Sequence, residues 1–195
     1  MSQILDKENL KKAIKRVKKN KGAPGVDGMT IEELVRYFAE HSEEIRHQLL
    51  SRTYLPQPVM RVEIPKSNGD KRLLRIPTVI DRAIQQAITQ QFSPIYEEIF
   101  HSTSYGVRLH KNAEMAIRQA LTNINDGCQW IFDIDLEGIF DTVHHNHLMT
   151  LIAKTIKDGD VIFLVRKYLV SGIQMDGGFK ESIIGPKKVA TYLHY

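Results

Sequence analysis

Cysteine is nearly absent from this sequence, with Cys128 as the single example in 195 residues. One thiol cannot form an internal disulfide, so the small disulfide-rich secreted folds are excluded. The sequence also has no apolar run long enough to cross a membrane and no signal-peptide pattern at its start. We therefore expect a cytoplasmic protein that does not contact a membrane.

The composition also differs from that of a disordered chain. Hydrophobic residues make up 42% of the sequence and charged residues 26%, which is ordinary for a globular domain. The length suits one good core, or one lobe and the beginning of another. The net charge is only +4, but one short segment concentrates the cations: Lys7, Lys11, Lys12, Lys15, Arg16, Lys18, Lys19 and Lys21. This density favours contact with a polyanion, and the alternative is a solvated helix face.

Apolar residues at helical spacing predict several amphipathic helices. Asp6 is the expected N-cap of the first helix, and Thr30 with Glu33 matches a capping box before the second. Between these two helices, the glycine- and proline-rich segment 22–28 predicts a loop. The predicted helices span residues 7–20, 29–54, 78–100, 112–124, 147–157 and 160–170.

The predicted helix over residues 78–100 contains two features of interest. Pro94 lies inside it, and a proline removes a backbone hydrogen bond, so we expect an interruption near Ser93. Asp81 and Arg82 are neighbours near its beginning, where we expect a local ion pair that orients the helix.

Alternating residues on both sides of an Asn-Gly turn predict a β-hairpin with arms 59–65 and 71–77. A second, shorter pair of strands is predicted within 173–184. The first hairpin carries an unusual number of cations: Arg61, Lys66, Lys71, Arg72 and Arg75. A basic ribbon that reaches over phosphates explains them, and an edge hairpin protected by charge is the alternative.

The segment WIFDIDLEGIFDTVHHNHL at 130–148 places three carboxylates at every second position: Asp133, Asp135 and Glu137. In a strand, these acids would share one face and the intervening apolar residues the other. Neighbouring carboxylates repel each other and are costly to desolvate unless a cation compensates. The pattern therefore predicts a strand that presents acids to a metal ion bound to phosphate.

Four segments in the same order resemble the reverse transcriptases encoded by group II introns. These are NKGAPGVDG at 20–28, IPKSNGDKRLLRIPTVIDRAIQQAI at 64–88, SYGVR at 104–108 and DIDLEGIFDTVHH at 133–145. The resemblance extends over the chain to about Gly185. It implies an RNA-directed DNA polymerase whose partners are an RNA template, a primer strand and dNTP. Intron RNA is a further candidate partner.

By this resemblance, Asp135 is the catalytic aspartate and a ligand of Mg²⁺ in the first acidic motif of the polymerase palm. Asp133 either supports that ligand or pairs with a basic neighbour. Phe140 corresponds to the aromatic residue that contacts the dNTP sugar and excludes a 2′-hydroxyl, although the sequence alone would place it in the core.

The resemblance also assigns phosphate contacts. Lys66 and Arg72 of the hairpin are the expected ligands of the dNTP triphosphate. Arg108 is expected to face the template or primer backbone. The basic helix and the following loop fit an RNA contact, for which the candidates are Lys11, Lys15 and Lys18.

The second acidic motif of the family, of the Tyr-Ala-Asp-Asp type, is absent from these 195 residues. One aspartate with partial coordination binds Mg²⁺ weakly. We therefore expect an N-terminal reverse transcriptase fragment that binds RNA and dNTP but does not polymerise alone. The alternative is a standalone RNA-binding fragment with maturase-like intron binding and no catalysis.

The predicted fold class is α+β, with a mostly helical fingers lobe, a basic β-hairpin and an incomplete polymerase palm. We expect the fingers region over residues 1–110 and the partial palm over 111–185. Residues 186–195 read as an atypical tail from a frameshift, a truncation or an artificial extension. An unfinished sheet exposes strand edges and apolar faces, so self-association is possible.

Overall fold

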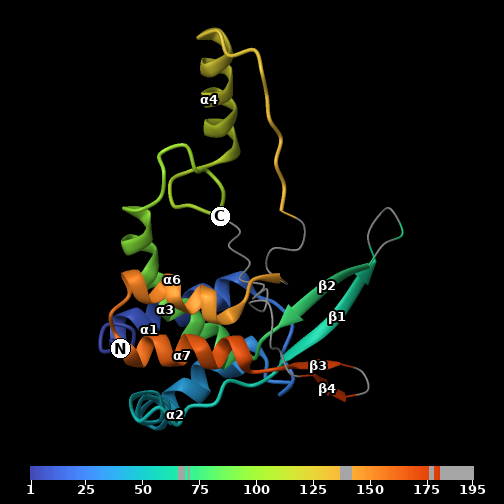
Figure 1. Ribbon diagram of the computed structural model, residues 1–195. Coiled ribbons are helices and arrows are strands. Elements are labelled where there is room, and N and C mark those ends of the chain that lie inside the picture. The colour runs from blue at the N-terminus through green and yellow to red at the C-terminus, as the bar shows by residue number, and fades with distance from the viewer. Residues whose placement is uncertain (66–68, 70, 137–141, 176–177, 181–195) are drawn as a thin grey trace.

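A computed structural model of the chain describes residues 1–65, 69, 71–136, 142–175 and 178–180. It has the predicted α+β character: helices form the body, and a small sheet projects from it (Figure 1). In chain order the elements are α1 (Lys7–Asn20), α2 (Ile31–Leu50), β1 (Val59–Pro65), β2 (Lys71–Ile76), α3 (Val79–Glu97), α4 (Ala113–Asn125), α6 (His145–Thr155), α7 (Gly159–Val170), β3 (Ile173–Met175) and β4 (Gly178–Lys180).

The predicted helix starts are confirmed by their caps. The Asp6 carboxylate accepts hydrogen bonds from the backbone N–H groups of Glu8 and Asn9, at 3.0 and 3.2 Å. Thr30 and Glu33 form the expected capping box at α2. Each cap satisfies N–H groups that have no partner within the helix.

The expected interruption at Pro94 is wrong, because α3 continues through this residue to Glu97. Pro94 lies in the last turns of the helix, so its missing N–H removes one hydrogen bond close to an end that is already incomplete. The Ser93 hydroxyl donates to the Thr89 carbonyl at 2.8 Å and adds a local polar contact in the same turn.

One hydrophobic cluster joins α1, α2 and α3 with the C-terminal end of α6 and with α7. Small residues let α1 and α3 approach closely, because Ala13, Ala83 and Ala87 are fully buried. Ile156 and Leu164 belong to the same cluster. The helices after residue 142 therefore share a core with the helices at the N-terminus.

The sheet has the strand order β2-β1-β3-β4. The predicted hairpin is confirmed, with β1 and β2 antiparallel and Ile64 opposite Arg72. The second predicted strand pair is also present, as antiparallel β3 and β4. In addition, β3 pairs in parallel with β1, with Val59 opposite Ile173, so the two hairpins form one sheet beside the helical body.

Helix α4 and the chain that follows it stand away from the core (Figure 1). The helix has no buried residue, and residues 129–136 are extended and carry no regular secondary structure. Among the described residues, no helix combines the length and the hydropathy that a membrane span requires.

Candidate nucleic-acid interface

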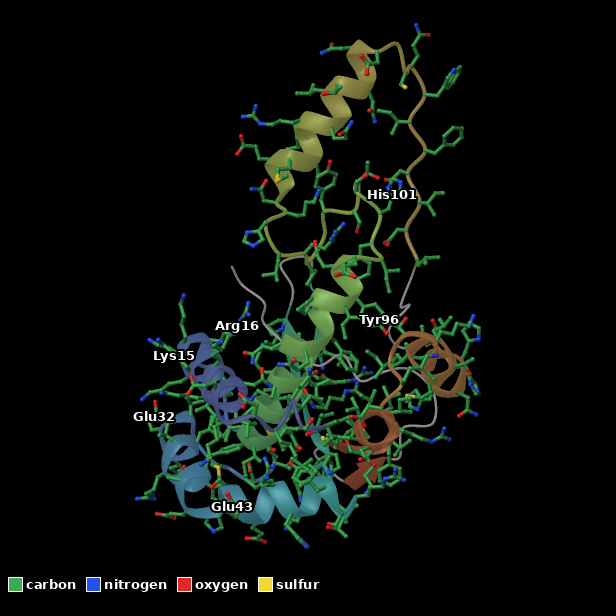
Figure 2. The ribbon with its side chains drawn as sticks, turned by 90° about the vertical axis from the view of Figure 1, so that its left-hand side faces the viewer. Lys15, Arg16, Glu32, Glu43, Tyr96 and His101 are labelled. Atoms are coloured by element: carbon green, nitrogen blue, oxygen red, sulfur yellow. The ribbon has the colours of Figure 1, made fainter. Side chains whose placement is uncertain are left out.

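The lysines of α1 lie on the side of the helix that faces solvent. Lys11, Lys15 and Lys18 are exposed, and their spacing of four and three residues places them in one stripe. Ala13 and Val17 are buried on the other side. Figure 2 shows Lys15 on the outside of α1, while Arg16 lies nearer to α3. The helix therefore presents a row of cations from a packed support.

A buried side chain, Asn9, fixes α1 against α3. Its amide nitrogen donates to the carbonyls of Ile4 and Ala87, at 2.9 and 3.1 Å. Its amide oxygen accepts from Gln90 and Gln91, at 2.8 and 2.9 Å. All the hydrogen-bonding groups of this amide are used, so α1 is held in position by directional contacts as well as by packing.

The loop at 22–28 is held against the beginning of α3. The Arg82 guanidinium donates to the Ala23 carbonyl at 2.7 Å. At Gly25 the contact is so close that an added Cβ would lie 2.7 Å from the Thr78 backbone. The expected ion pair between Arg82 and Asp81 is wrong, because Arg82 is directed to the loop and Asp81 has other partners.

Asp81 lies at the centre of a buried hydrogen-bond network. Its carboxylate accepts from the Tyr54 hydroxyl at 2.7 Å, the Thr78 hydroxyl at 2.8 Å and the Gln57 backbone N–H at 3.1 Å. Burial raises the pKa of the Asp81 carboxyl, although the hydrogen bonds from Tyr54 and Thr78 act in the opposite direction. The same burial, with the nearby Asp81 charge, raises the pKa of Tyr54 and of Tyr168.

Sequence reasoning missed the Asp81 network. The motif TVID did contain a local signal, because Thr78 and Asp81 have the spacing of a capping pair, and Thr78 Oγ1 accepts from the Asp81 N–H at 3.2 Å. The contact with Tyr54 connects positions 27 residues apart, and no local pattern predicts it.

Cations on the hairpin are partly paired. Glu63 contacts Lys71 at 2.8 Å and Arg61 at 3.5 Å, and the hydrogen bond from Lys71 lowers the pKa of the Glu63 carboxyl. Lys66 and the side chain of Arg72 lie outside the described residues. Their expected contacts with dNTP therefore stay predictions.

Arg108 was expected at the nucleic-acid backbone, but it is buried. Its side chain is 6% exposed, contacts Glu97 at 2.7 Å and donates to the carbonyls of His101 and Ser104 at 2.6 and 3.0 Å. These bonds close the loop after α3 onto the end of that helix. The arrangement gives Arg108 a structural role, and its contact with nucleic acid stays a prediction.

The acidic strand predicted in the segment 130–148 is wrong over its described residues 130–136. Residues 129–136 are extended but carry no strand pairing. A strand is stabilised by a neighbour that completes its hydrogen bonds and covers its apolar face, and this segment lies on neither the sheet nor the helical body. Trp130, Phe132 and Ile134 are 86%, 88% and 83% exposed.

Asp133 and Asp135 are both exposed, and neither makes a hydrogen bond or an ion pair with other described residues. Glu137 and Phe140 lie outside the described part of the chain. Asp135 is therefore open to solvent, and its roles as metal ligand and catalytic residue stay predictions, as does the sugar contact of Phe140.

The described residues do not fit a resident Mg²⁺ ion. Within the described ranges, no group of three His, Cys, Asp or Glu side chains is placed to hold a metal. Mg²⁺ requires several oxygen ligands in near-octahedral geometry, and a solvent-exposed carboxylate on an unpaired segment does not supply them.

In a comparison with known proteins, residues 64–189 match the family model described as reverse transcriptase (RNA-dependent DNA polymerase). Protein YkfC from Escherichia coli is 38% identical over 176 residues, which cover 87% of this chain and 46% of that protein. The group II intron-encoded protein LtrA from Lactococcus lactis is 32% identical over 184 residues, or 90% of this chain and 30% of LtrA. The chain thus spans less than half the length of these relatives.

Among solved structures, the chain is similar to a subunit of a partial Cas6-RT-Cas1–Cas2 complex. The TM-score is 0.60 at 18% identity, and the match covers 95% of this chain and 30% of that subunit. At this identity, the likeness concerns the fold alone.

Proposed function

Because this chain belongs to the reverse transcriptase (RNA-dependent DNA polymerase) family and is related to group II intron-encoded proteins, we propose that it is the RNA-binding N-terminal part of such an enzyme. The observation that supports this proposal is the exposed stripe of Lys11, Lys15 and Lys18 on α1. A rigidly supported row of ammonium groups binds phosphates without regard to base sequence. The proposed partners are an RNA template and its primer strand, and intron RNA belongs to the alternative given below.

In this proposal, the fingers region spans residues 1–110 and contacts the RNA, while 111–185 is a partial palm. Lys66 and Arg72 contact the dNTP triphosphate, and Asp135 becomes a Mg²⁺ ligand only beside a second acidic motif. These 195 residues contain no such motif, so the chain alone does not extend a primer. We propose that the chain binds RNA in the cytoplasm.

The alternative function is RNA binding without any polymerase role, as in a maturase-like fragment. It is favoured by the described residues around Asp135, where no metal-binding cluster forms. RNA binding is common to both functions. The dNTP contact discriminates them, since a pure RNA-binding fragment has no use for Lys66 and Arg72.

The test is RNA binding measured by fluorescence anisotropy at several salt concentrations. Changing Lys11, Lys15 and Lys18 together to Ala is expected to weaken binding at least about tenfold and to reduce the salt slope by about 0.7 for each lost phosphate contact. The matched control changes three other exposed cations, Arg36, Lys154 and Lys157, to Ala. It removes the same charge from surfaces other than α1, so it should bind RNA almost as well as the unchanged chain.

Two results would decide against the proposal. Unchanged RNA affinity in the α1 variant would remove the basis of the interface. Sustained primer extension by the purified chain with dNTP and Mg²⁺, lost in Asp135→Ala, would show that the chain is an enzyme by itself. Binding of dNTP by the unchanged chain, lost after Lys66→Ala and Arg72→Ala, would favour the polymerase fragment over the maturase-like alternative.

A further inference from the structure

A cavity of about 160 Å³ lies between α1, the second half of α3 and the loop that follows α3. Gln86, Gln90 and Ser93 line it at spacings of four and three residues, so they share one face of α3. Arg16 lines it from α1 and Phe100 from the loop side. In Figure 2, Arg16 marks the α1 side of this region, and Tyr96 lies farther along α3.

One of the residues that line this cavity carries a polar group without a partner. Gln86 is 2% exposed, and its amide nitrogen makes no hydrogen bond with any described residue. The other polar side chains around the cavity are satisfied: Gln90 with Asn9, Thr89 with the Gln85 carbonyl, Ser93 with the Thr89 carbonyl, and Arg108 with Glu97.

An unpartnered buried amide is destabilising, because it loses its hydrogen bonds to water and gains none in return. A ligand with a hydrogen-bond acceptor would remove this penalty when it enters the cavity. The required ligand therefore presents an acceptor atom to Gln86 and tolerates largely apolar walls, which Pro94, Phe100, Val107 and Leu109 provide.

These requirements describe a nucleobase better than a phosphate. A base is flat and largely apolar on its faces, and its edge carries the carbonyl or ring-nitrogen acceptors that a glutamine amide binds. A phosphate would need several donors, whereas Arg108 and Glu97 neutralise each other at the wall. The lysine stripe is on the same helix as Arg16, so α1 carries both the phosphate-binding row and one wall of the cavity.

We propose that this cavity receives one base extruded from single-stranded RNA, with the Gln86 amide donating to the base edge. The inference rests on the proposed RNA binding by α1 and specifies its substrate as an unpaired strand. Extruding a base costs least where the strand is already single. The cavity thus adds a preference for unpaired RNA to the sequence-independent affinity of the lysines.

The experiment compares two fluorescein-labelled strands, a short oligo(A) RNA and the same sugar–phosphate chain without bases. The unchanged chain should bind oligo(A) about fivefold more tightly, as one hydrogen bond and the buried base imply. The variant Gln86→Met keeps the length of the side chain but removes the amide, and it should bind both strands about equally. Its thermal unfolding should occur at the same temperature or a higher one, since no hydrogen bond is lost.

Gln85→Met is the matched control. Gln85 is the neighbouring residue, also has an unpartnered buried amide atom and does not line the cavity. It should keep the preference for oligo(A). A measurement on the unchanged chain provides independent evidence: the Gln86 side-chain amide signal in NMR should shift when adenosine is added and should not shift with ribose 5-phosphate.

The outcomes separate this inference from the proposed function. If both strands bind equally and both lose affinity when the α1 lysines become Ala, RNA binding stands and the base cavity is wrong. An unchanged preference in Gln86→Met, or an adenosine-insensitive Gln86 signal, also overturns it. If neither strand binds the unchanged chain, the cavity and the proposed function are both wrong.

Discussion

Asp81 connects parts of the chain that are distant in sequence. Its carboxylate accepts hydrogen bonds from Tyr54 after α2, from Gln57 before β1 and from Thr78 at the beginning of α3. The Tyr168 ring of α7 lies close enough for the Asp81 charge to raise the pKa of its hydroxyl. This acidic residue therefore serves to join the hairpin to the helical body, which is a different use from that of an acid at a metal site.

The raised pKa of Asp81 predicts a pH-dependent stability. When the pKa of Asp81 is higher in the folded state than in the unfolded state, the folded state binds more protons than the unfolded state at every pH between these two pKa values. The free energy of unfolding should therefore fall as the pH rises from about 4 through the folded pKa, by about 1.4 kcal/mol for each unit of pKa difference. Asp81→Asn carries no charge, so its stability relative to the unchanged chain should increase over the same interval.

Urea unfolding followed by circular dichroism at a series of pH values measures this difference. Glu63 and Glu97 have lowered pKa values through Lys71 and Arg108, and their contribution rises with pH in both proteins, so it cancels in the comparison. A constant stability difference between the two proteins at every pH would contradict a raised pKa for Asp81.

The loop at 22–28 depends on close contact with the beginning of α3. Gly25→Ala is expected to lower the free energy of unfolding by about 2 kcal/mol, because its Cβ would overlap the Thr78 backbone and overpacking costs about 1 to 3 kcal/mol. Gly106→Ala is the matched control, since an added Cβ there meets no atom within 4 Å. Thermal unfolding of both variants measures the effect, and equal stability would show that the loop adjusts freely.

Local sequence signals predicted the helices and both hairpins, while contacts between distant segments were not predictable. Asp6 and Thr30 cap helices through neighbours within three residues, and the Asn-Gly turn specifies the first hairpin. By contrast, the use of Arg108 depends on Glu97 and on carbonyls of a folded loop. The strand expected at 130–136 failed for the same reason, since alternation describes a face but does not provide the neighbouring strand that a sheet requires.

The candidate site was predictable only in part. Charge density and the family resemblance together pointed to Lys11, Lys15 and Lys18, and their exposed stripe follows directly from helical spacing. Gln86 has no signal in the sequence, because a glutamine on an amphipathic helix is ordinary. Its significance arises from the packing of α1 on α3, which buries the amide without giving it a partner.

Two regions of the molecule differ in how they bury apolar surface. The helical body packs its apolar residues into one cluster, whereas α4 and the extended segment after it expose theirs. Met115, Ile117 and Leu121 are exposed on α4, close in sequence to the exposed aromatic residues of the segment 130–136. Large exposed apolar side chains that gather in one region mark sites of contact with other molecules, and an unpaired extended segment offers free backbone groups to another chain.

We therefore expect the chain to associate with itself through the segment 130–136. Changing Phe132 and Ile134 together to Ser should reduce the association measured by sedimentation at rising protein concentration, because each exposed apolar side chain contributes to burial between chains. The stability of the helical body should not change, since neither residue contacts its core. Val35→Ser is the control: Val35 is 46% exposed on α2, and its loss should leave the association unchanged. A chain that stays monomeric at all concentrations, or one whose association persists in the double variant, would show that this exposed segment does not mediate contact between copies.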